Sequence, residues 1–234
     1  MNAEHLQHVI LQGRRAETFE QRAQLKLRAM QVALEGTAPN VAYAETSHMF
    51  VKTFADVVLE RLADCAKISI VFLRRPARDT IWSQLRLGWF SAGHSGKNVW
   101  YYDINDVHVN ERQVSYSTNS SDAVDSLIGY NADVLQRGIE LERLIQRKHR
   151  QGDWKNVQVI DMWLKDVSDA ENVEAFLPKL GLKADLKRLA QLKSMDTNAR
   201  ELKKDRFSSA VTIEQVDARI AYMLNKLPLP RQAL

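Results

Sequence analysis

The stretch that decides the fold is ISIVFLRRPARDTIWSQLRLGW, residues Ile68–Trp89. It begins with six apolar or small residues without alternation, a pattern typical of a strand buried on both faces of a parallel sheet. Arg74 and Arg75 follow at once, and from Thr80 to Trp89 the apolar residues return at helical spacing. The stretch therefore predicts a central strand that passes through a cluster of arginines directly into a helix.

The rest of the chain alternates between strand and helix patterns. Residues 156–164 predict a second strand and residues 41–45 a short third one, which is few for a parallel sheet. Helical spacing or strong helix formers cover residues 14–36, 50–62, 121–147, 168–181, 184–194 and 212–226, and residues 91–120 are predicted to be a long loop. Alternating strands and helices predict an α/β fold with helices on both faces of a parallel sheet.

Composition limits the classes of protein to which the chain can belong. With 234 residues, 45% hydrophobic and 26% charged, it is expected to form a single soluble domain over residues 1–234: a helical N-terminal segment (1–40), an α/β core (41–185) and C-terminal helices (186–234). The net charge of +4 is too small to indicate nucleic-acid binding by itself. No run approaches the roughly 20 apolar residues of a membrane span. The one cysteine, Cys65, excludes an internal disulfide and favours a reducing, cytoplasmic location.

The arginine cluster is the strongest candidate site. Ligands of open parallel sheets bind at the carboxyl ends of the strands, where Arg74 and Arg75 are expected to lie. The helix that opens near Asp79 would add a positive dipole end, and guanidinium groups and the Ser83 hydroxyl suit phosphate oxygens. The same residues fit an ordinary surface turn in which Asp79 pairs with an arginine and caps the helix, so spacing alone leaves both interpretations open.

The segment VFLRRPARDTIWS resembles the 3′-phosphate-binding segment of sulfotransferases, enzymes that use 3′-phosphoadenosine 5′-phosphosulfate (PAPS). Four positions match the arginine, basic residue, aspartate and serine of that motif, in the order Arg75, Arg78, Asp79 and Ser83. The proline of the motif is displaced by one position. The resemblance implies that Arg75 and Ser83 hold the 3′-phosphate of the cofactor, with Arg74 and Arg78 as further cofactor-binding residues.

Two further segments resemble the same family in the same order. YAETSHMFVKTFADVVLERL (43–62) is similar to the segment that precedes the motif in bacterial and heparan-type members, and residues 156–182 resemble the later strand and helix. The resemblance covers roughly residues 41–185 and implies a three-layer, phosphate-loop-type fold. No glycine-rich phosphate loop precedes Tyr43, so the sheet is expected to be incomplete at the N-terminus, and the chain to be a fragment or a degenerate member.

The activity implied by the resemblance is transfer of a sulfuryl group from PAPS to a hydroxyl or amino group of a small-molecule or carbohydrate acceptor. Such a reaction needs a base, and the candidates are His48 and Glu45. His48 equally fits a hydrogen-bonded loop histidine, and Glu45 an ion pair with an arginine. No metal ion is expected, because His94 and His108 lack a partner at ligand spacing, and His5 and His8, three residues apart, have no third ligand nearby.

The missing phosphate loop leaves open whether the chain is an enzyme. The alternative hypothesis is a non-catalytic nucleotide-binding or protein-interaction module on the same scaffold. Exposed edge strands and the amphipathic N-terminal helix would favour self-association of such a module as a homo-oligomer. Nucleic-acid binding ranks last among the hypotheses.

Overall fold

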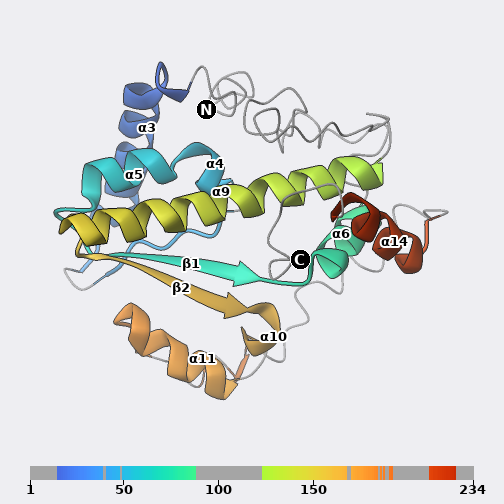
Figure 1. Cartoon of the computed structure of the whole chain (residues 1–234). Helices are drawn as coiled ribbons and strands as arrows, with labels where there is room; N and C mark the ends of the chain where they lie inside the picture. The colour runs from blue at the N-terminus through green and yellow to red at the C-terminus, as the bar shows by residue number, and fades with distance from the viewer. Residues whose placement is uncertain are drawn as a thin grey trace.

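The computed structural model describes residues 15–38, 41–47, 49–87, 123–167, 170–183, 185, 187, 190–191 and 211–224. Figure 1 shows a long helix lying along a small parallel sheet, with shorter helices on both sides. In the described residues the elements are α3 (Phe19–Leu34), α4 (Phe50–Thr53), α5 (Ala55–Leu62), β1 (Ile68–Arg74), α6 (Ala77–Arg86), α9 (Ala123–Gln151), β2 (Val157–Trp163), α10 (Leu164–Val167), α11 (Ala170–Phe176), the 3-10 helix η1 (Leu177–Leu180) and α14 (Ile213–Leu224). The prediction of an α/β fold is confirmed, with helix predominating over strand.

The sheet of the described residues has two strands. β1 and β2 pair in parallel, from Ile68 opposite Val157 to Arg74 opposite Trp163. Both strands coincide, to within one residue at each end, with the segments 68–73 and 156–164 predicted to form them, because β-branched side chains suit a pleated, half-buried surface. The long connection between them, as parallel pairing requires, contains α6 and α9.

The third strand predicted over residues 41–45 is wrong. Residues 41–47 adopt no regular secondary structure. The Tyr43 hydroxyl and the Glu45 carboxylate bond to the ammonium group of Lys26 on α3, so side chains rather than a strand ladder attach this segment to the fold.

Helix α9 covers one face of the sheet, and the core lies between them. Gly138 of α9 sits against the Phe72 ring, because a Cβ atom at this position would lie 3.2 Å from Cε1 of that ring. Leu141 and Ile145, one and two turns further along α9, are buried in the same core cluster as Ile70. This packing fixes the middle of α9 over the carboxyl half of β1.

The opposite face of the sheet is partly open. Val71 and Leu73 of β1 are 37% and 55% exposed, so the prediction that this strand is buried on both faces is wrong. The described helices on that side, α10, α11 and η1, lie beyond β2 (Figure 1). η1 is bonded to the sheet near the amino end of β2, where the Gln158 amide donates to the Lys179 carbonyl at 2.9 Å.

A second core lies between α6, α9 and α14. Ile81 and Leu85 of α6 pack with Leu127 of α9 and with Val216 and Ile220 of α14. The periodicity of the sequence predicts the apolar face of α6 that carries Ile81 and Leu85, although the helix begins at residue 77, three residues earlier than residue 80. The helix predicted over residues 50–62 is divided into α4 and α5 at residue 54, whose φ of −133° leaves the helical region.

Several predictions fall on residues outside the described part. These are the base candidate His48, the loop over residues 91–120 and most of the helix over residues 184–194. Within the described residues, none of the helices has the length and apolar character needed to cross a membrane.

Candidate functional site

The candidate site is the junction at which β1 passes into α6. β1 ends at Arg74, and Pro76 precedes α6 with φ −52° and ψ 132°, an extended conformation that turns the chain into the helix. The first amide of the helix ladder, that of Thr80, donates to the Pro76 carbonyl at 3.1 Å. The carboxyl end of a parallel strand and the amino end of a ten-residue helix therefore lie next to each other, as an anion site of this kind requires.

Arg74 is engaged by the neighbouring strand. Its Nε donates to Oδ1 of Asp161 on β2, and its guanidinium lies 5.5 Å from the centre of the Phe72 ring. Arg74 therefore already has a counter-charge within the sheet. In this arrangement it joins the two strands at their carboxyl ends.

Arg78 is engaged by the C-terminal helix. Its Nη1 donates to Oδ2 of Asp217 on α14 at 3.2 Å, and its Nε donates to Asp79 at 3.3 Å. The hydrogen bonds that Arg78 donates to Asp217 first, and then to Asp79, raise the pKa of its guanidinium above the ordinary value. Arg78 thus links α6 to α14, a contact that the spacing of the sequence does not predict.

Arg75 differs from both neighbours. Its side chain is exposed, and no carboxylate among the described residues pairs with it. Ser83 is half-buried nearly two turns into α6, and no hydrogen bond between described residues joins its hydroxyl to Arg75. The structure therefore leaves the Arg75 guanidinium available at the junction, with the Ser83 hydroxyl further along the same helix.

Glu45 belongs to a different part of the molecule. Its carboxylate accepts a hydrogen bond from the Tyr43 hydroxyl at 2.8 Å and forms an ion pair with Lys26. Lys26 is buried, lies over the rings of Tyr43 and Phe54, and has a pKa lowered by desolvation. Among the described contacts, Glu45 is thus held by α3, and none joins it to the arginines of the junction.

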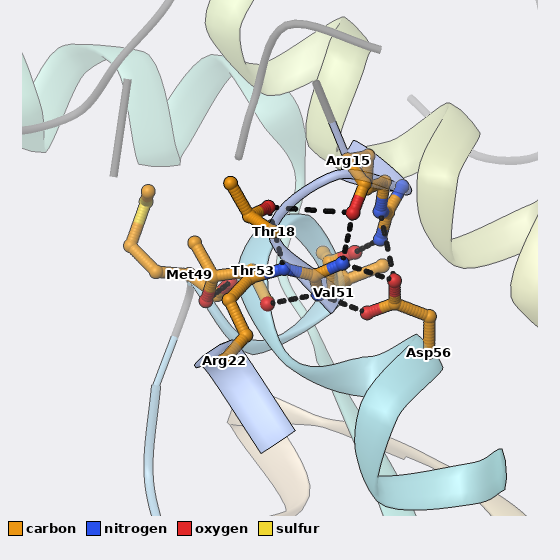
Figure 2. Close-up of polar contacts among 7 residues, drawn as sticks. All are labelled: Arg15, Thr18, Arg22, Met49, Val51, Thr53 and Asp56. Carbon is orange, nitrogen blue, oxygen red and sulfur yellow. Dashed lines mark hydrogen bonds and ion pairs between the residues drawn. The ribbon is translucent and has the colours of Figure 1, made fainter. Parts of the chain in front are cut away.

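A set of buried charges that the sequence patterns did not predict joins α3, α4, α5 and α9. Figure 2 shows one part of it, in which Arg22 of α3 and Arg15 of the preceding turn converge on Asp56 of α5. Arg22 is fully buried and binds both carboxylate oxygens of Asp56, at 2.6 and 2.8 Å, while its Nη1 also donates to the Thr53 carbonyl at 2.8 Å. Burial alone would raise the pKa of Asp56, but the hydrogen bonds from Arg22 and the charges of Arg15 and Arg22 outweigh it and lower the pKa.

The second part of this set lies between α4 and α9. Lys52 is fully buried, and its Nζ lies 2.7 Å from Oδ2 of Asp133. Arg137, one turn further along α9, donates from Nε to the same carboxylate at 2.9 and 3.1 Å. Burial would raise the pKa of Asp133, but the charges of Lys52 and Arg137 outweigh it and hold the pKa below its ordinary value. The spacing of Asp133 and Arg137 is the one feature of the sequence that could have indicated this pair.

In the part of the chain that the structure describes, no three histidine, cysteine, aspartate or glutamate side chains gather in a group that could hold a metal ion. Comparisons of the chain with protein families, with curated proteins and with solved structures found no match.

Proposed function

We propose that the chain is a sulfotransferase-like protein that binds the 3′-phosphate of PAPS at the β1–α6 junction. The observation that carries this proposal is the different state of the three arginines. Arg74 and Arg78 are neutralised by carboxylates of β2 and α14, whereas Arg75 is exposed and has no carboxylate partner among the described residues. Arg75, to which the sulfotransferase motif assigns phosphate binding, is thus the arginine whose charge remains available to a ligand.

The chemistry of the junction suits a phosphate group. A guanidinium fork binds two phosphate oxygens at once, and the positive end of α6 adds a favourable field within its first turn. The Ser83 hydroxyl would donate one further hydrogen bond to the same group. The proposal includes a three-layer, phosphate-loop-type sheet around this junction and a cytoplasmic location, which suits the exposed thiol of Cys65.

The proposed reaction is transfer of a sulfuryl group to a hydroxyl or amino group of a small-molecule or carbohydrate acceptor. The acceptor atom forms a bond to sulfur while the bond between sulfur and the 5′-phosphate oxygen breaks, and adenosine 3′,5′-bisphosphate leaves. A base takes the acceptor proton. Glu45 would first have to leave Lys26 to do so, which makes His48 the better base candidate of the two.

The engagement of Glu45 also favours the second hypothesis. A carboxylate that is ion-paired with Lys26 and hydrogen-bonded to Tyr43 is not placed to take a proton from an acceptor, as expected of a protein that binds a nucleotide without turning it over. In this version Arg75 and Ser83 keep their roles, and only the transfer step is lost.

Thermal unfolding with adenosine 3′,5′-bisphosphate tests the binding step. At a concentration about 100-fold above Kd, a ligand stabilises the folded chain by about 2.7 kcal/mol, which raises Tm by roughly 5–10 °C for a chain of this size. Arg75→Ala should abolish the shift, and Arg150→Ala, an exposed arginine at the end of α9, should preserve it. An unchanged melting curve at millimolar ligand rejects the proposal. Transfer from labelled PAPS to sugars and phenols then separates the enzyme from the non-catalytic module.

A further inference from the structure

The amino end of the sheet carries an inference that does not depend on the proposed function. Three segments meet there: residues 63–67 before β1, residues 148–156 from the last turn of α9 to the start of β2, and residues 177–183 of η1 and its C-cap. Figure 1 shows the C-terminal end of α9 and the starts of both strands at the left of the view, whereas α6 lies at the right. These three segments, here called the basic end, are therefore at the other end of β1 from its junction with α6.

Two contacts bring lysines of the basic end close together. The Ile68 amide donates to the Asn156 carbonyl at 2.9 Å, so Lys67 and Lys155, the residues before them, start from neighbouring positions. Lys67 also reaches η1, because a Cβ atom at Gly181 would lie 3.8 Å from its Nζ. Lys67 is therefore placed between the start of β2 and the end of η1.

The turn that carries Lys155 is braced. Trp154 has a φ of 50°, a conformation that bulky residues seldom adopt, and its side chain is buried in the core under the sheet. Its carbonyl accepts the Val157 amide at 2.9 Å and lies 3.0 Å from Nε2 of His149. The buried ring and these bonds hold a strained backbone in place, so Lys155 extends from an ordered turn.

The basic end contains the positive excess of the whole chain. Its segments hold six cations and two carboxylates, Asp64 and Asp153, and the excess of four equals the net charge of +4 of the 234 residues. One of the cations, Lys148, lies 3.5 Å from Asp153 and over the Trp154 ring. The other five are exposed and form no ion pair with any residue that the structure describes: Lys67, Arg150, Lys155, Lys179 and Lys183.

The end of a helix accounts for only part of this charge. The negative dipole end of α9 favours Arg150 in its last turn, but the effect falls off beyond that turn and does not account for Lys155. Exposed charges of one sign that gather without carboxylates repel one another and attract a partner of opposite sign. The basic end therefore suits a ligand that carries several negative charges.

The apolar side chains nearby indicate the kind of ligand. Of the large apolar side chains that are exposed in the described part of the chain, Leu182 alone belongs to the basic end. A protein interface has an apolar centre, and a membrane-binding surface has apolar side chains that insert among the lipids. The one aromatic ring of Phe, Tyr or Trp type in the three segments, that of Trp154, is buried and cannot stack on single-stranded bases. Cations without apolar anchors suit the backbone of a duplex, where phosphates alone supply the contacts.

We propose that the basic end binds the phosphate backbone of double-stranded nucleic acid without regard to base sequence. Each of the five exposed cations replaces a counterion at one phosphate. The three segments lie far apart in the sequence, so the basic run at the end of α9 gives little support for such binding by itself. The folded arrangement assembles the surface by adding Lys67, Lys179 and Lys183 to that run.

The test is the fluorescence anisotropy of a labelled duplex titrated with the full chain over a series of KCl concentrations. Contact with about five phosphates predicts that the logarithm of the affinity falls with the logarithm of the salt concentration with a slope of about −4 to −5. Duplexes of unrelated sequence should bind equally. Lys67→Gln and Lys155→Gln should each weaken the affinity several-fold and reduce the steepness of the slope by about one.

The matched control is Lys165→Gln, which removes the same charge from an exposed lysine of α10, beyond the other end of β2, and should change neither the affinity nor the slope. Melting curves show that the three variants are folded, since none of these lysines has an ion pair to lose. The proposal is overturned by a slope shallower than about −2, by equal losses in Lys67→Gln and Lys165→Gln, or by a strong preference for one base sequence. Tighter binding to vesicles with anionic lipid or to a sulfated polysaccharide than to the duplex at the same salt also overturns it, and assigns the basic end to that partner.

Discussion

Replacing Asp133 by asparagine should be among the most destabilising single changes in the described part of the molecule. The side chain is 2% exposed, and its carboxylate lies within 2.7 Å of the Lys52 ammonium and 2.9 Å of Nε of Arg137. Asp133→Asn keeps the shape of the side chain but removes the counter-charge of two buried cations. Breaking a buried ion pair by removal of one partner costs about 3–5 kcal/mol, and we expect a loss in that range.

The free energy of unfolding at neutral pH, measured by urea denaturation, gives this loss directly. The matched control is Glu20→Gln, which removes a carboxylate from the exposed pair with Arg61 and should cost only about 0–1 kcal/mol. Combining Asp133→Asn with Lys52→Met should recover part of the loss, because the second change removes one of the buried charges left without its partner. A loss equal to that of the surface control, or no recovery in the double variant, would refute the assignment of a charge-paired interior.

Three other changes test the fold. Since the pKa values of Asp56 and Asp133 are lowered from 3.8, their contribution to stability should be complete above that pH and fall away as the pH drops through the lowered values, which Tm against pH would show. Gly138→Val should cost about 1–3 kcal/mol in urea denaturation, because a Cβ there would lie 3.2 Å from the Phe72 ring, whereas Gly138→Ala should cost less since alanine favours helix. Ile81→Ala should cost about 2–5 kcal/mol, because this side chain is 1% exposed between α6, α9 and α14.

The parts of the fold that the sequence predicts are those set by local patterns. Apolar residues within a single segment predict each of these elements: the two strands, the long α9 and the apolar face of α6. Gly181 is an example at the level of one residue: it ends η1 with a φ of 74°, a conformation that glycine adopts without strain, as its position after a helical pattern indicates.

The parts that the sequence did not predict depend on partners far along the chain. Arg22 and Asp56 are 34 positions apart, and Arg78 and Asp217 are 139 apart, so only the folded arrangement decides which charges meet. The residues next to a charged residue in a helix also do not show whether its side chain is buried. Arg22 and Lys26 occupy the buried side of α3, where a periodicity argument would place apolar residues.

The same limit explains the outcome at the candidate site. The motif matches Arg75, Arg78, Asp79 and Ser83, and the structure brings Arg75 and Arg78, together with Arg74, to one strand-to-helix junction. The motif by itself cannot indicate that carboxylates of β2 and α14 neutralise Arg74 and Arg78, because Asp161 and Asp217 lie outside it.

The exposure of Arg75 decides how the proposed site at the β1–α6 junction responds to salt. Arg75 is exposed, so a phosphate bound there interacts through a medium that ions screen within about 8 Å at physiological ionic strength. The pairs of Asp133 with Lys52 and Arg137 lie in the interior, where mobile ions penetrate poorly and screening is weaker. Added chloride should therefore weaken nucleotide binding at the junction steeply and change the loss of unfolding free energy in Asp133→Asn little. Nucleotide binding that does not weaken as chloride is added would mean that the phosphate meets buried charges, which contradicts a site at the exposed Arg75.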